Sequence, residues 1–317
     1  MDVLTIIFVV LAACFAPVLV SMGLETIRRP PQTPGALYWD PGIAVRYADI
    51  NGTRIRYITT GSGPNLVLLH TLRTQLDIFQ KIIPALARDF TVHALDYPGH
   101  GFSDIPDAQY RPDLFVGTVE GFLERMDIRD ATLAGVSIGG SIPLLIAAKG
   151  NPRVTRAIGI NPYDYADGNG TARANAVAWL VFTLARVPVL GETVMRFRNR
   201  LVERLIMQGG VARPDTLPRE FLEQMYVSGE RKGHYRAFIN LIRNAREWEE
   251  AHALHGKIRI PVLLIYGNRD WSRPEERRRT ASEIPGARVE TVPDGGHFLV
   301  LDQPDRVIDL IRNFARS

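Results

Sequence analysis

The sequence AGVSIGG at residues 134–140 places Ser137 between two glycines directly after an apolar run. Residues 131–134, which precede it, are predicted to form a buried strand. Residues 142–148, which follow it, are predicted to form an apolar helix. The serine is therefore expected at a sharp turn from a strand into a helix, where its hydroxyl stands clear of the sheet.

Such a turn makes strict demands on the neighbouring side chains. The serine is held in a strained backbone conformation, and the positions two residues away have to be very small, as Gly135 and Gly139 are. The first helix amides, led by that of Ile138, carry partial positive charge that suits a developing oxyanion. We predict a nucleophilic Ser137; the alternative is a glycine-rich turn with an incidental serine.

Strand and helix signals alternate on both sides of this turn. Residues 45–50 and 53–60 alternate around Asn51-Gly52, which predicts a β-hairpin. Apolar runs typical of parallel strands follow at residues 66–69, 91–95, 131–134, 154–160, 262–265 and 289–292. Stretches with helical patterns separate most of them, including one that ends near Arg88 and one at 114–126. The order predicts an α/β fold class with a doubly wound, mostly parallel sheet led by an antiparallel hairpin.

Strand signals stop between residue 161 and about residue 260. Helical patterns occupy residues 175–185, 193–207, 219–228 and 234–251, so an inserted helical cap is predicted at about residues 166–256. Its first helix is almost wholly apolar and includes Trp179, Phe182 and Leu184. Packing of the cap on its domain is favoured over membrane docking as the reason for this apolarity. In either case the wall that faces Ser137 is expected to be apolar.

Composition limits the classes of function. The chain has 317 residues, of which 46% are hydrophobic, enough to bury the core of one large α/β domain. The formal charge is +4, but the basic residues are scattered, so no nucleic-acid partner is expected. Cys14 is the single cysteine, which excludes an intrachain disulfide and any cysteine-based metal site. The sequence makes no prediction of the oligomeric state.

The N-terminal residues carry a long apolar run. Residues 3–24 have no charge, and at ~1.5 Å per residue they are long enough to cross a ~30 Å hydrocarbon layer. A membrane anchor over residues 1–29 is therefore predicted, with a linker at 30–37 and the folded domain at 38–317. A cleaved signal peptide, which lacks its basic region here, and lipidation at Cys14 are the alternatives. Arg28-Arg29 after the run predicts a cytoplasmic catalytic domain by the positive-inside rule.

Two further polar residues lie at predicted strand ends. Residues 260–270 form a strand that runs into a loop carrying Asp270, and residues 293–298 form a glycine turn carrying His297. The C-terminal ends of the strands form the edge where an open α/β sheet places its site. The chain order Ser, Asp, His is also that of a hydrolase elbow. Asp270 as a helix N-cap and His297 as an ordinary loop residue are the alternatives, and Asp164 is a second candidate for the carboxylate.

Over residues 38–317 the chain resembles the α/β-hydrolase superfamily. Five motifs carry the resemblance: His70, DYPGHGFS at 96–103, the serine elbow, GNRD at 267–270 and GGHF at 295–298. The resemblance implies that Ser137 is the nucleophile, that His297 is the general base and then acid, and that Asp270 orients the imidazole.

The resemblance also implies the residues around the triad. The backbone N–H groups of Ile138 and Leu72 would form the oxyanion hole, although Thr71 stands where the family usually has glycine. Arg73 beside it is expected to reach the substrate pocket together with Trp179 and Phe182. No metal ion or organic cofactor is expected for the reaction.

The expected function is a membrane-anchored serine hydrolase, similar to a carboxylesterase or monoacylglycerol lipase, that cleaves an apolar ester through an acyl-enzyme. One alternative is a carbon–carbon bond hydrolase that uses the same triad under a helical cap. The other is a non-catalytic ligand receptor with this fold. The serine at position 137 departs from epoxide hydrolases and haloalkane dehalogenases, whose nucleophile is a carboxylate.

Overall fold

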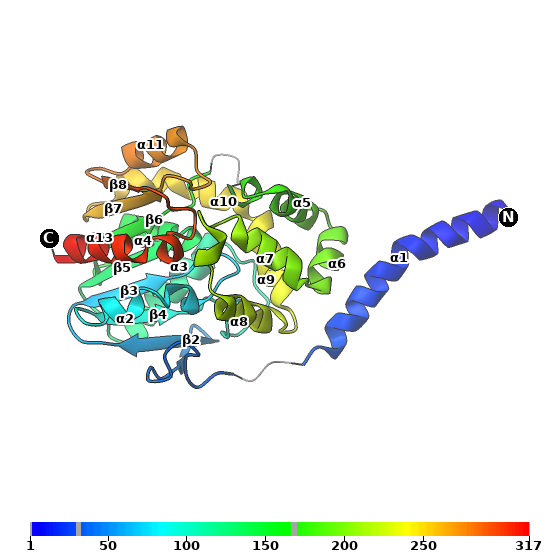
Figure 1. Cartoon of the computed structure of the whole chain (residues 1–317), viewed down its shortest axis with the longest axis horizontal. Helices are drawn as coiled ribbons and strands as arrows, with labels where there is room; N and C mark the ends of the chain where they lie inside the picture. The colour runs from blue at the N-terminus through cyan, green and yellow to red at the C-terminus, as the bar shows by residue number, and fades with distance from the viewer. Residues whose placement is uncertain (1, 30–32, 166–169, 317) are drawn as a thin grey trace.

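A central sheet organises the computed structural model, which describes residues 2–29, 33–165 and 170–316. Within these residues, eight strands form one sheet in the order β1-β2-β4-β3-β5-β6-β7-β8 (Figure 1). The strands are β1 (Arg46–Ile50), β2 (Thr53–Thr60), β3 (Asn65–Leu69), β4 (Thr91–Leu95), β5 (Ala131–Val136), β6 (Val154–Ile160), β7 (Val262–Gly267) and β8 (Arg288–Val292).

The sheet has the predicted topology. β1 and β2 form an antiparallel hairpin, and β2 also pairs antiparallel with β4. All the other pairs are parallel. Because β4 lies on one side of β3 and β5 on the other, the chain changes direction across the sheet at β3, which opens a crevice at the C-terminal ends of these strands. The predicted α/β class with a doubly wound, mostly parallel sheet is confirmed.

The central strands of the sheet are buried on both faces, which explains their apolar runs in the sequence. In β3, Leu66 and Leu68 pack into one hydrophobic cluster, and Val67 and Leu69 pack into the other. All four side chains have no exposed surface. The first cluster lies under helices α2 (Ile83–Leu86), α12 (Leu299–Asp302) and α13 (Pro304–Arg316), and the second under α3 (Pro112–Arg125) and α4 (Ile138–Lys149). Helix α11 (Pro274–Glu283) connects β7 to β8.

The chain between β6 and β7 forms a cap of short helices. They are α5 (Ala176–Ala185), α6 (Leu190–Phe197), α7 (Arg200–Gln208), α8 (Arg219–Gly229), α9 (His234–Arg243), α10 (Ala245–Glu250) and the 3₁₀ helix η4 (Ala251–Lys257). Two predicted helices are each broken in two: residues 193–207 at Arg198, whose φ is 43°, and residues 234–251 at Asn244. The predicted start of the cap, at residues 166–169, lies outside the described residues, as do residues 30–32 of the predicted linker.

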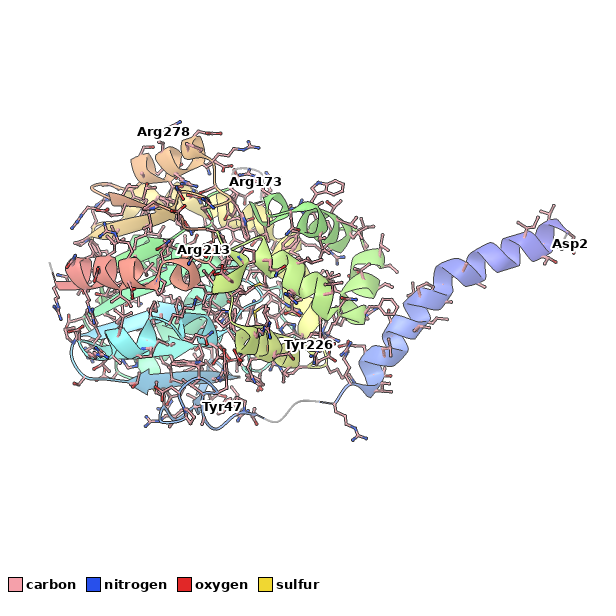
Figure 2. All side chains as sticks on the ribbon, in the orientation of Figure 1. Asp2, Tyr47, Arg173, Arg213, Tyr226 and Arg278 are labelled. Carbon is pink, nitrogen blue, oxygen red and sulfur yellow. The ribbon has the colours of Figure 1, made fainter. Side chains whose placement is uncertain are left out.

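Helix α1 (Val3–Ile27) projects from the body at its N-terminal end, where Asp2 caps it by accepting a 2.8 Å hydrogen bond from the Thr5 amide (Figures 1 and 2). Its C-terminal end contacts the cap. There the Glu25 carboxylate accepts hydrogen bonds from the Arg198 guanidinium at 2.7 Å and from the Gly233 amide at 2.6 Å.

The predicted membrane-anchored localisation, with a single N-terminal span and a cytoplasmic domain, is wrong. Within the part of the chain that the structure describes, no helix has the length and apolarity needed to cross a bilayer. The last turns of α1 instead bury polar groups against the protein: Ser21 is fully buried, and Glu25 is 7% exposed and paired with Arg198.

Candidate active site

Ser137 sits between β5 and α4 in the strained conformation expected of a nucleophile elbow. Its φ is 58° and its ψ is −122°, a region that non-glycine residues rarely adopt. The flanking glycines are required by packing: a Cβ on Gly135 would lie 1.9 Å from the Gly139 carbonyl oxygen, and one on Gly139 would lie 2.2 Å from the His70 carbonyl oxygen. The Ser137 amide donates to the Ile160 carbonyl at 2.9 Å, which fixes the turn to β6.

The loop after β3 is held by His70. Its Nδ1 lies 2.8 Å from the Thr71 carbonyl oxygen, and the Tyr97 amide donates to its Nε2 at 3.1 Å. Since a carbonyl only accepts and an amide N–H only donates, the proton of this imidazole is on Nδ1. Burial lowers the pKa of His70 to about 3, so the ring is neutral, and its two hydrogen bonds join the loop after β3 to the loop after β4. Leu72 and Arg73 follow in the same loop, and Arg73 has a φ of 65°.

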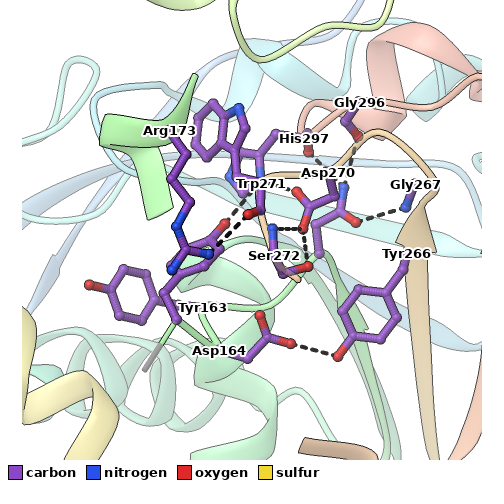
Figure 3. A network of polar contacts seen from close by, with 12 residues as sticks. Tyr163, Asp164, Arg173, Tyr266, Gly267, Asp270, Trp271, Ser272, Gly296 and His297 are labelled. Carbon is purple, nitrogen blue, oxygen red and sulfur yellow. Dashed lines mark hydrogen bonds and ion pairs between the residues drawn. The ribbon is translucent and has the colours of Figure 1, made fainter. Parts of the chain in front are cut away.

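Asp270 and His297 meet at the predicted positions after β7 and β8. The Asp270 Oδ1 lies 2.6 Å from the His297 Nδ1, and both side chains are buried (Figure 3). The other carboxylate oxygen accepts hydrogen bonds from the Ser272 amide at 3.0 Å and from the Ser272 hydroxyl. Burial alone would raise the pKa of Asp270, but the attraction of His297 and these hydrogen bonds outweigh it and lower that pKa.

The second ring nitrogen of His297, Nε2, has different surroundings from Nδ1. Within the described residues, the His297 Nε2 is buried and has no hydrogen-bond partner. His297 and Ser137 both line one cavity, so the structure brings the three predicted triad residues together around it. A neutral imidazole whose Nδ1 proton points at a carboxylate presents a basic lone pair at Nε2.

Asn161 is a positioning residue that the sequence analysis missed. It follows β6, is fully buried and has a φ of 43°. Its side-chain amide donates to the carbonyl oxygens of Gly296 and His297 at 3.0 and 2.9 Å, and its oxygen accepts from the Gly267 amide at 2.9 Å. One side chain therefore ties the loop that carries Asp270 to the turn that carries His297. An asparagine at a strand end was the available signal.

Asp164, the second candidate for the triad carboxylate, lies elsewhere. It accepts a 2.8 Å hydrogen bond from the Tyr266 hydroxyl, below the His297–Asp270 pair in Figure 3. Burial, reinforced by the charge of Asp270, raises the pKa of Asp164 to about 7. The carboxylate that contacts the imidazole is therefore Asp270, and Asp164 is a buried acid beside the site.

The cavity above Ser137, called here the Ser137 cavity, has a volume of about 380 Å³. Most of its lining is apolar, and the cap supplies the larger share: Val177, Leu180, Val181, Phe182, Leu184, Val194, Met195, Phe197, Val202, Ile206, Met207 and Phe238. Among the predicted substrate-binding residues, Phe182 and Arg73 line it. Trp179 does not: it is 58% exposed on the outside of α5.

The two predicted oxyanion donors are Ile138, which directly follows the serine, and Leu72, in the loop after β3. Leu72 lines the Ser137 cavity. Ile138 is the first residue of α4, so its amide has no acceptor within the helix and sits at the positive end of the helix dipole. Thr71, which stands in the place of the family's usual glycine, turns its own amide to the Thr74 hydroxyl at 3.2 Å.

One side of the cavity carries a positive and a negative side chain that pair with each other. The Arg73 guanidinium pairs with the Glu203 carboxylate at 3.3 Å and donates to the His234 Nδ1 at 3.0 Å. Burial, with the positive charge of Arg73 nearby, lowers the pKa of His234 well below its usual value, so this ring accepts as a neutral base. Arg73 therefore reaches the cavity with its charge already matched.

Comparison with known proteins identifies the family of this chain and several related folds. The family model described as alpha/beta hydrolase fold matches residues 64–304. Haloalkane dehalogenase 2 of Mycobacterium bovis is 27% identical over 278 residues, which cover 83% of this chain and 91% of that protein. Two solved structures share the fold at 23% identity: Cfl2 of Burkholderia cenocepacia (TM-score 0.76, 90% of this chain and 99% of that one) and the enol-lactonase of Burkholderia xenovorans (TM-score 0.62, 86% and 100%).

Proposed function

This chain belongs to the alpha/beta hydrolase fold family, and on that basis we propose that it is a serine hydrolase that cleaves an apolar carboxylic ester. The observation that carries the proposal is the free Nε2 of His297 in the cavity that Ser137 also lines, with Asp270 held 2.6 Å from the opposite ring nitrogen. This is the arrangement that converts a weakly nucleophilic hydroxyl into an attacking group.

The first half of the proposed reaction acylates the serine. The Ser137 oxygen attacks the ester carbonyl carbon while its proton passes to the His297 Nε2. Asp270 stabilises the imidazolium that forms, and the backbone amides of Ile138 and Leu72 receive the negative carbonyl oxygen. The tetrahedral intermediate collapses as His297 returns the proton to the leaving alkoxide. An alcohol departs, and the acyl group stays on Ser137.

The second half hydrolyses the acyl-enzyme. Water gives a proton to the His297 Nε2 and attacks the acyl carbon. The resulting intermediate breaks its bond to the Ser137 oxygen as His297 returns the proton to that oxygen, and a carboxylic acid departs. A serine nucleophile suits this cycle because its oxygen forms one new bond to the acyl carbon in the first half, and that same bond breaks in the second half. One relative of this chain is named a haloalkane dehalogenase, a class whose nucleophile is expected to be a carboxylate. Residue 137 of this chain is a serine, which sets the chain apart from that class.

The cavity supports a neutral, apolar substrate. A volume of about 380 Å³ is at the small end of ligand pockets and suits a short or medium acyl chain. An anionic substrate would have to compete with Glu203 for Arg73, which already pairs with that carboxylate at 3.3 Å. We therefore infer that the acyl chain packs against the cap side chains and that the ester carbonyl lies at Ser137.

A fluorophosphonate probe tests the assignment directly, because it forms a covalent adduct with an activated serine and releases fluoride. We expect one adduct per chain, located at Ser137 by peptide mass spectrometry and absent from Ser137→Ala. The variant should remain folded by circular dichroism and lose ester hydrolysis by roughly 10⁴-fold or more. A matched Ser141→Ala variant, which removes the buried hydroxyl that accepts from the Tyr163 amide at 2.9 Å, should still be labelled.

The alternatives give different results in the same assays. A ligand receptor would show no labelling and no turnover of any ester. A carbon–carbon bond hydrolase would be labelled at Ser137 but would act on vinylogous diketones and leave a panel of acetyl to decanoyl esters intact. Turnover that persists in purified Ser137→Ala would refute the serine mechanism.

A further inference from the structure

Two histidines and a glutamate meet at the end of the cap, away from the Ser137 cavity. His252 and His255 lie in η4, a 3₁₀ helix with 3.0 residues per turn, so side chains three residues apart stack directly above one another. Their ring centroids are 4.5 Å apart. Glu283, the last residue of α11, faces both rings, and one of its oxygens lies 3.3 Å from each Nδ1.

The contacts of His252 leave this arrangement incomplete. Its Nε2 lies 3.0 Å from the Tyr163 carbonyl oxygen, which only accepts, so the Nε2 carries a proton. In the neutral ring the Nδ1 then has a lone pair, and that lone pair faces the Glu283 carboxylate oxygen at 3.3 Å. Two acceptors oppose each other there, at a separation longer than the usual 2.7–3.2 Å hydrogen bond. A positive charge between them is required to make the contact favourable.

We propose that His252, His255 and Glu283 bind a divalent transition-metal ion of the zinc type. In a tetrahedral zinc site with ligand bonds of about 2.0–2.1 Å, neighbouring ligand atoms are about 3.3–3.4 Å apart. The carboxylate oxygen lies 3.3 Å from each imidazole nitrogen, and the three donor atoms all lie within 4.8 Å of one another. Two imidazoles and one carboxylate suit zinc and disfavour calcium and magnesium, which take oxygen ligands.

Neighbouring groups hold the proposed ligands in place, and one side of the site faces solvent. The Tyr163 carbonyl fixes the tautomer of His252. A backbone carbonyl is a usual hydrogen-bond partner of a metal-binding imidazole. Arg279 lies 3.8 Å from the other oxygen of Glu283 and 3.7 Å from Glu249, so two carboxylates offset its charge and one Glu283 oxygen is left for the metal. The Glu283 side chain is 32% exposed, which leaves a solvent-facing fourth position for water.

The proposed site would brace the end of the cap. It joins η4, where the chain leaves the cap, to α11 and to the loop after β6 through Tyr163. That loop continues to Tyr165, whose hydroxyl lies 3.3 Å from the His297 Nδ1. The metal is thus a structural clamp and takes no part in the chemistry at Ser137.

Metal binding by the full, tag-free chain tests the proposal. After treatment with EDTA and dialysis, Zn²⁺ at about 100 times its Kd should raise the Tm by about 5 °C, whereas Mg²⁺ and Ca²⁺ should leave it unchanged. Elemental analysis should find one zinc per chain. Co²⁺ should give the intense visible absorption of a tetrahedral site, a readout independent of enzymatic activity.

Three variants locate the site. His255→Gln and Glu283→Gln should weaken zinc binding at least tenfold and abolish the cobalt absorption. Glu249→Gln removes the same charge beside the same arginine but no ligand, and it should bind zinc as the wild type does. If His255→Gln does not fold, Glu283→Gln carries the test alone. A wild-type chain that binds no zinc, because a proton on His252 already satisfies Glu283, would overturn the proposal, and so would zinc binding unchanged in Glu283→Gln.

Discussion

The indole of Trp271 lies flat against the imidazole of His297, with ring centroids 3.7 Å apart and planes 14° apart. The stack covers one face of the imidazole, and the 2.6 Å contact with Asp270 fixes its edge. Trp271 is itself anchored, because its indole N–H donates to the Gly209 carbonyl of the cap at 2.9 Å. The orientation of the proposed general base therefore depends on the cap as well as on the sheet.

Replacing Trp271 with leucine should lower kcat by roughly 10- to 100-fold and leave KM within a few-fold, because the imidazole loses the surface that holds its plane. Steady-state kinetics on a short-chain ester measures both constants. Trp179→Leu is the matched control, since that indole is 58% exposed and lies outside the cavity. Equal losses in the two variants would show that Trp271 has no positioning role.

Asp270→Asn should reduce kcat by about 10⁴-fold, because an amide no longer favours the tautomer that leaves a lone pair at the His297 Nε2. Asp164→Asn should keep kcat within about tenfold of the wild type, since Asp164 contacts Tyr266 and not the imidazole. Parallel measurements of kcat on the two variants decide the matter. The opposite ranking would move the triad carboxylate to Asp164.

Asp164 should make the folded state less stable as the pH rises. Its pKa is about 7 in the folded chain and 3.8 in the unfolded reference, so between about pH 4 and pH 7 the unfolded chain ionises while the folded chain keeps the proton. The unfolded state then binds fewer protons, and the contribution of this group to stability falls with pH and is lost above pH 7. Asp164→Asn removes this dependence. The change that the substitution causes in the free energy of unfolding should therefore be more favourable at pH 8 than at pH 4, by up to a few kcal/mol.

Urea unfolding at pH 4, 6 and 8 measures this change. The exposed Asp309→Asn variant removes a carboxylate from α13 and serves as the control for net charge. An Asp164→Asn chain whose stability relative to the wild type is the same at all three pH values would contradict a buried acid that titrates near neutrality.

Acyl-chain preference should follow the size of the Ser137 cavity. Each buried methylene contributes about 0.8 kcal/mol, so kcat/KM should rise a few-fold per carbon until the cavity of about 380 Å³ is full and then fall. Phe182 and Phe238 pack edge to face on its wall with centroids 5.4 Å apart. Phe182→Ala and Phe238→Ala should shift the optimum to longer chains, and Trp179→Ala should not. A flat profile from acetyl to decanoyl in the wild type would exclude the cap as the selector.

The central sheet was predictable from the sequence because strands buried on both faces need continuous apolar runs. The predicted strand at residues 154–160 matches β6, and the hairpin around Asn51-Gly52 forms as expected, with positive φ at both turn residues. The elbow was predictable for a steric reason, since a Cβ at Gly135 or Gly139 would clash with the backbone and only glycine fits there. Asp270 and His297 followed from the rule that strand ends carry the site.

The remainder depended on contacts between distant residues, which local patterns do not record. The apolarity of α5 did not tell which of its faces turns inward: Phe182 lines the Ser137 cavity, whereas Trp179 is exposed. Apolarity also suggested an anchor at the N-terminus, where burial of Glu25 against Arg198 depends on a residue far along the chain. The contacts of Asn161 and those between His252 and Glu283 join separate loops and helices. Their local signs were an asparagine at a strand end for the first and the i, i+3 spacing of the two histidines for the second.

The ion pair between Glu25 and Arg198 has a consequence for how the chain should be handled. Arg198 forms part of the wall of the Ser137 cavity, and its guanidinium is held by Glu25 at 2.7 Å and by the Arg231 carbonyl at 3.1 Å. Trimming the N-terminal helix to ease purification would leave a nearly buried arginine short of its carboxylate at the rim of the pocket. The selectivity and inhibitor affinities of a shortened enzyme would then describe a different binding site from the one that the full chain presents.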